Sequence, residues 1–192
     1  MYKPVIVIFI VLFFSSALVA QDFDANYHSR YKFYAGPEVA IPVGRLDKIS
    51  RIGYGATTGL TYNCGRFEPG LLLGFLYFDG IEEMTQSLTI IPLLASGGYR
   101  FMFTTRFYCH ARIAAGGSAV ILRQDPDNIS YFERAEYETK TSFDFMTRGG
   151  LGLVYMMAHD FRISLASDYA VIVEHTNFFQ FFTAGLSAIY LF

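Results

Sequence analysis

The chain has 192 residues, of which 53% are hydrophobic and 17% charged, and its net charge is −2. This charge gives no basis for binding nucleic acid or for a polybasic membrane anchor. After the first twenty residues no apolar run is long enough for a membrane helix, so the high apolar content points to strands. The 17 glycines and 18% aromatic residues suit a narrow barrel with rings at a lipid interface.

Residues 1–20 are predicted to be a cleaved signal peptide. Lys3 supplies the basic flank, the unbroken apolar run 5–14 follows, and small residues up to Ala20 offer a cleavage site. An uncleaved membrane anchor is the alternative. We expect residues 21–30 to be a polar leader without periodicity.

Eight segments in which apolar and small polar residues alternate follow the leader, as expected for strands with two unlike faces. They are predicted at 31–42, 52–63, 66–78, 88–100, 106–122, 142–157, 161–173 and 179–192. The connections alternate between short ones and longer, more polar ones. The short ones lie at 64–65, 101–105 and 158–160, and the longer ones at 44–51, 79–87, 123–141 and 174–177. Short periplasmic turns and longer outer loops are typical of an outer-membrane barrel.

The polar faces carry few charges and consist mostly of Gly, Ser, Thr and Ala, which is too poor for a wall in water. Aromatic residues of the apolar faces gather beside the short connections. They are Tyr62, Phe67, Tyr99, Phe107, Tyr155, Phe161, Tyr190 and Phe192. We therefore predict that the apolar faces contact lipid and that the polar faces line the interior. A soluble carrier barrel with the opposite arrangement is the alternative.

The chain resembles the small eight-stranded outer-membrane barrels of the OmpA/OmpX type in strand number, face alternation, loop asymmetry and its terminal Phe192 with Tyr190 two residues before it. The resemblance implies an all-β, antiparallel, up-and-down transmembrane barrel over 31–192, a monomer in the outer membrane of a double-membraned, Gram-negative-type bacterium. It implies that Tyr190 and Phe192 form the C-terminal signal read by the outer-membrane assembly machinery. We predict no cofactor and no metal, and because the sequence stops with the barrel we expect no peptidoglycan-binding domain.

Function is less specific, because this barrel serves several roles. We expect a non-enzymatic protein with surface loops and an envelope-structural or adhesion role. The alternative is a narrow porin-like channel or conduit for small or hydrophobic solutes. His175 lies between Glu174 and Thr176, but the His–x–Ser–Asn spacing of outer-membrane lipid deacylases is absent, so no catalytic site is predicted.

Four charged residues are predicted near mid-height on the interior faces: Glu38, Arg112, Arg148 and Asp168. Buried charges persist when they are paired, and the lumen of an eight-stranded barrel is about filled by side chains. We expect these residues to form an ion network that plugs the barrel. A gate that opens to pass ions is the alternative.

The longest connection, 123–141, contains Tyr131, Phe132 and Tyr137. These rings make it a candidate surface for a host or lipopolysaccharide partner. The alternative is an extension of the strands in which the rings pack against neighbouring loops.

Two further expectations concern Pro92 and the cysteines. The segment 88–94 is apolar on both faces and contains Pro92, so we expect a bulge there that exchanges the faces. Cys64 and Cys109 are expected to be too far apart for a disulfide.

Overall fold

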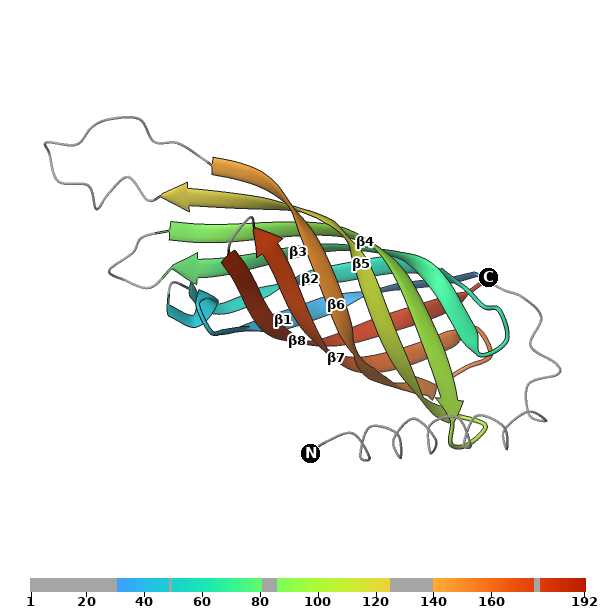
Figure 1. Cartoon of the computed structure of the whole chain (residues 1–192). Helices are drawn as coiled ribbons and strands as arrows, with labels where there is room; N and C mark the ends of the chain where they lie inside the picture. Colours follow the sequence, from blue (N-terminus) through green and yellow to red (C-terminus); the bar gives the residue numbers. More distant parts are fainter. Residues whose placement is uncertain (1–30, 49, 81–85, 125–139, 175–176) are drawn as a thin grey trace, which may run out of the picture.

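The computed structural model describes residues 31–48, 50–80, 86–124, 140–174 and 177–192, and it forms one closed antiparallel barrel (Figure 1). Each strand pairs with its neighbours in chain order, and β1 pairs with β8. The strands are β1 (Tyr31–Val43), β2 (Ser50–Tyr62), β3 (Phe67–Gly80), β4 (Gln86–Met102), β5 (Phe107–Gln124), β6 (Lys140–Met156), β7 (Phe161–Glu174) and β8 (Asn177–Leu191). All eight predicted strands are confirmed within two residues of their predicted bounds.

Among the described residues, no helix is both long enough and apolar enough to cross a membrane. The predicted signal peptide and polar leader, 1–30, lie outside the part of the chain that the structure describes.

The short connections and the C-terminus lie at one end of the barrel, which we name the short-turn end; the opposite end is the outer end (Figure 1). The β2–β3 turn is closed by reciprocal backbone hydrogen bonds between Cys64 and Phe67, and Gly65 adopts the positive φ that this turn requires. At the outer end, Gly44 (φ 67°) leads from β1 into a 3-10 helix, η1 (Leu46–Lys48). Leu46 is fully buried there against the barrel interior.

The apolar faces point away from the lumen, which confirms the predicted orientation. Tyr155 and Phe161 are exposed on the outside, whereas Arg148 and Asp168 are buried inside. Rings at the short-turn end face each other in cross-strand pairs. These pairs are Tyr31↔Tyr62, Phe67↔Tyr99, Phe107↔Tyr155 and Phe161↔Tyr190. Aromatic pairs of this kind stabilise neighbouring strands and form a belt around the barrel.

The interior divides into two regions along the barrel axis. Toward the outer end it is a packed apolar layer, which Leu46 of η1 covers. Its other members include Leu72, Leu76, Phe78, Ile90, Leu94, Met146, Ile172 and Phe181, all fully buried. Toward the short-turn end the interior carries most of the buried charges, together with a second apolar cluster formed by Tyr34, Tyr108, Val154, Ile189 and Leu191. The sequence predicted a polar interior throughout, so the apolar layer is a feature that it did not predict.

The bulge expected at Pro92 is wrong. The pairing of β4 with β3 and with β5 keeps one register on both sides of Pro92. Leu88, Ile90, Pro92 and Leu94 are all buried inside, so the faces never exchange. This strand is apolar on both faces because its inner face belongs to the apolar layer.

Cys64 is exposed in the β2–β3 turn, Cys109 lies on β5, and both are free thiols.

Candidate functional site

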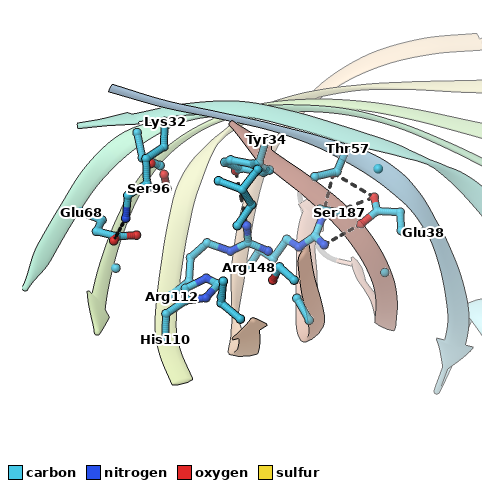
Figure 2. Close-up of a pocket in the computed structure, with 18 of the residues that line it drawn as sticks. Lys32, Tyr34, Glu38, Thr57, Glu68, Ser96, His110, Arg112, Arg148 and Ser187 are labelled. Carbon is cyan, nitrogen blue, oxygen red and sulfur yellow. Dashed lines mark hydrogen bonds and ion pairs between the residues drawn. The ribbon is translucent and has the colours of Figure 1, made fainter. Parts of the chain in front are cut away.

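The candidate site is the charged layer of the lumen, which comprises Glu38 of β1, Arg112 of β5, Arg148 of β6 and Asp168 of β7. The structure brings all four predicted residues together, and Figure 2 shows three of them, Glu38, Arg112 and Arg148. Two arginines and two carboxylates make this layer electrically neutral. The side chains of Glu38, Arg148 and Asp168 are 2–3% exposed and that of Arg112 is 11% exposed.

Arg148 lies at the centre of the charged layer. Its guanidinium donates to Glu38 Oε2 at 2.6 Å and to Asp168 Oδ2 at 2.8 Å, with a third bond to Thr183 Oγ1 at 2.9 Å. Thr57 Oγ1 donates to Glu38 Oε1 at 3.2 Å. The low dielectric of the interior strengthens these hydrogen bonds. Because both carboxylates have partners, neither remains as an unpaired buried charge.

Arg112 binds the carboxylate of Asp168 as well. Its guanidinium donates to Asp168 Oδ2 at 2.7 Å and lies 5.7 Å from the ring centre of Tyr34. Tyr34 itself lies against Gly59 on β2, where an added Cβ would be 2.4 Å from the tyrosine ring. Glycine on the inner face therefore makes room for a large side chain on the next strand.

A second charged cluster lies nearer the short-turn end. Glu68 is paired with Lys32 and with Arg100, whose Nε is 2.8 Å from Glu68 Oε1. Arg100 also donates to Asn63 and to the carbonyl of Gly65, and so connects the lumen to the β2–β3 turn. The sequence did not predict this cluster.

Tyr108 is the large ring of that second cluster. The guanidinium of Arg162 donates to its hydroxyl at 3.0 Å and lies 5.6 Å from its ring centre. The alternation of β5 signalled this position, because Tyr108 falls on the face shared with Arg112. Its role went unpredicted because tyrosine suits either face of such a strand.

A small cavity remains between the two clusters. It measures about 50 Å³ and is lined by residues that include Lys32, Glu68, Ser96, His110 and Arg112 (Figure 2). A space of this size accommodates no more than a few water molecules. Among the described residues, no three His, Cys, Asp or Glu side chains are grouped so as to hold a metal ion.

The other predicted site residues lie elsewhere. Phe192 closes the barrel through reciprocal backbone hydrogen bonds with Tyr31, at 3.0 and 3.1 Å, and its ring stacks on those of Tyr31 and Tyr190. The loop residues Tyr131, Phe132 and Tyr137, like His175, lie outside the described residues.

The closed eight-stranded barrel with an apolar exterior and a charged interior defines the class: the chain has the fold of the small outer-membrane β-barrel proteins. Neither a protein-family model nor a curated protein sequence matches the chain.

Several solved structures of that class are similar to the chain. A major outer membrane protein from Thermus thermophilus has a TM-score of 0.60 at 12% identity, over 86% of this chain and 100% of that one. Ail, the attachment invasion locus protein of Yersinia pestis, has a TM-score of 0.59 at 12% identity over the same shares. Neisserial surface protein A has a TM-score of 0.56 at 14% identity, over 84% of this chain and 95% of that one. At these identities the similarity concerns the fold.

Proposed function

We propose that the chain is a non-enzymatic, monomeric barrel of the outer membrane, with a closed lumen and with loops that act at the cell surface. The observation that carries this proposal is the pairing of Glu38, Arg148, Asp168 and Arg112 across the lumen. The apolar layer stacked on it toward the outer end adds a second barrier. The exposed apolar exterior and the belt of rings support placement in a bilayer.

Outer-membrane placement also rests on the predicted export signal and on the terminal Tyr190 and Phe192, which fit recognition by the assembly machinery. In such barrels the short turns face the periplasm and the longer connections face outward. The short-turn end is therefore the periplasmic end in this proposal. A closed lumen leaves the outer surface as the part that can contact partners.

The proposed contact surface is the connection between β5 and β6. Residues 125–139 contain five acidic side chains and one arginine, together with Tyr131, Phe132 and Tyr137. Ail has been crystallised with the heparin analogue sucrose octasulfate. The acidic composition of this connection argues against a polyanionic sugar here and favours a cationic or aromatic surface on a partner.

Planar-bilayer recording of the purified protein tests the closed lumen. We expect no steady conductance. A steady large conductance would overturn the plug and support the alternative, a narrow channel. Heat-modifiable gel migration of the same sample, before and after boiling, verifies that a folded barrel was recorded.

A further inference from the structure

The outer wall of the barrel has a hollow of about 1030 Å³ across β4, β5, β6 and β7. It lies on the face that contacts lipid in the proposed function, and the inference below rests on that proposal. The hollow exists because the outward positions of this wall carry small side chains. Among them are Ala95, Gly97, Ala111, Ala115 and Gly149.

Two of the glycines flank a single large residue. In the register of the sheet, Ile113 pairs with Gly97 on one side and with Gly149 on the other, and Ile113 is 74% exposed. The wall on either side of Ile113 is therefore mostly backbone, and Leu151, Tyr169 and Val171 line the hollow farther along β6 and β7. Molecules dissolved in the bilayer core can approach the strands here more closely than where Leu or Phe side chains cover them.

The side chains that line the hollow are apolar, apart from hydroxyl groups and two arginines. Arg112 and Arg148 contribute to its wall, but their guanidiniums are bound to carboxylates in the lumen. Phe67 and Tyr99 form a cross-strand pair at the short-turn end of the hollow. Beyond these rings, Arg106 is exposed in the turn that joins β4 to β5.

From the middle of the wall to the short turn, the surface thus presents an apolar hollow, then aromatic rings, then a cation. A glycerophospholipid presents its groups in the same order: acyl chain, ester region, phosphate. We propose that the hollow seats one acyl chain of a glycerophospholipid from the leaflet at the short-turn end, with its phosphate near Arg106. The rings lie at the depth of the ester groups, where tyrosine is favoured.

A second copy of the chain fits this surface less well. A two-fold dimer centred on the hollow would bring the two Arg106 side chains toward each other across the axis, where like charges repel. It would also place the hollow of one copy opposite the hollow of the other at the two-fold axis.

Photolabelling of the vesicle-inserted protein tests the site. The probe is phosphatidylglycerol with a diazirine midway along one acyl chain, added in trace amount to vesicles of phosphatidylethanolamine and phosphatidylglycerol. Labelled peptides are mapped by mass spectrometry. We expect several-fold more labelling on the outward residues of β4–β6 than on the β1–β8 wall.

Two pairs of variants test the two ends of the lipid. Gly149→Leu fills the hollow, and the nearest atoms to an added Cβ there are 3.8 Å away; Gly117→Leu is its control, with open space on the same wall. Gly149→Leu should abolish the enrichment, and Gly117→Leu should retain it. Arg106→Gln should lower it several-fold, whereas Arg123→Gln at the outer end of β5 should not.

Even labelling around the barrel, or unchanged enrichment in Gly149→Leu, would overturn the site. So would chain-to-chain cross-links through the hollow. Gel migration of each vesicle sample separates the two proposals. A protein that does not insert as a heat-modifiable barrel defeats the membrane function and the lipid site together. A protein that inserts but is labelled evenly defeats the lipid site alone.

Discussion

Arg112 and Asp168 form an ion pair although their strands are not neighbours. Arg112 lies on β5 and Asp168 on β7, and both pair in the register with Gly150 of the intervening β6. A Cβ at residue 150 would lie 2.4 Å from Asp168 Oδ1 and 2.1 Å from the Ser167 carbonyl oxygen. The absence of a side chain at Gly150 is therefore a condition for the ion pair.

Gly150→Leu should destabilise the barrel by about 3 kcal/mol, because it overpacks the lumen and separates the ion pair. Gly149→Leu is the matched control, since its side chain would point outward and the nearest atoms to an added Cβ there are 3.8 Å away, in ordinary contact. Urea unfolding from vesicles, followed by gel migration, measures both variants. Equal stability of the two would contradict the role assigned to Gly150.

Arg148→Met should cost about 3–5 kcal/mol, because Glu38 loses its cation inside a low-dielectric interior. The double variant Glu38→Gln with Arg148→Met removes one charge of each sign and keeps the pair of Arg112 with Asp168. We expect it to recover most of the loss. The chain has no tryptophan, so tyrosine emission or gel migration reports the unfolding. A double variant less stable than Arg148→Met would count against charge balance as the cause.

Arg112→Ala and Arg148→Ala should each remain silent in planar bilayers. Either variant opens the charged layer, but the apolar layer toward the outer end stays closed by packed side chains such as Leu72 and Phe181. Conductance should require Leu72→Ala and Phe181→Ala in addition to Arg148→Ala. Steady current through either single variant would show that the apolar layer does not seal the lumen.

Deletion of Phe192 should lower the amount of protein in the outer membrane, because it removes the terminal ring and the backbone pair with Tyr31. Phe192→Ala keeps that backbone pair and removes the ring alone. If the ring is the assembly signal, both variants should be depleted in cells, whereas purified Phe192→Ala should still fold into vesicles. Normal membrane levels of Phe192→Ala would contradict the signal.

Alternation predicted the strands and the charged layer because it is a property of each strand alone. Where the two faces differ strongly, as on β6, the inner side is evident from the sequence. There Phe143, Phe145, Leu151 and Leu153 alternate with Asp144 and Arg148. Alternation places all four residues of the charged layer on inner faces, and in the structure hydrogen bonds link them in the order Glu38, Arg148, Asp168, Arg112.

The apolar layer could not be predicted by the same reasoning. Leu71, Leu72 and Leu73 follow one another on β3, and alternation does not say which of them faces inward when all are apolar. The run 88–94 poses the same problem, and Pro92 suggested a bulge that the register does not contain. Ion pairs between strands that are not neighbours, such as Lys32 of β1 with Glu68 of β3, depend on the stagger of the closed sheet. No single strand encodes that stagger.

The strands of the barrel are unequal in length. The β5–β6 hairpin has strands of 18 and 17 residues, whereas β1 has 13. In Figure 1 the outer ends of β5 and β6 project beyond those of β7 and β8. A peptide tag inserted between Gln124 and Lys140 would thus stand farther from the bilayer than one inserted between Glu174 and Asn177. Antibody staining of intact cells should favour the first insertion wherever sugar chains shield the lower rim.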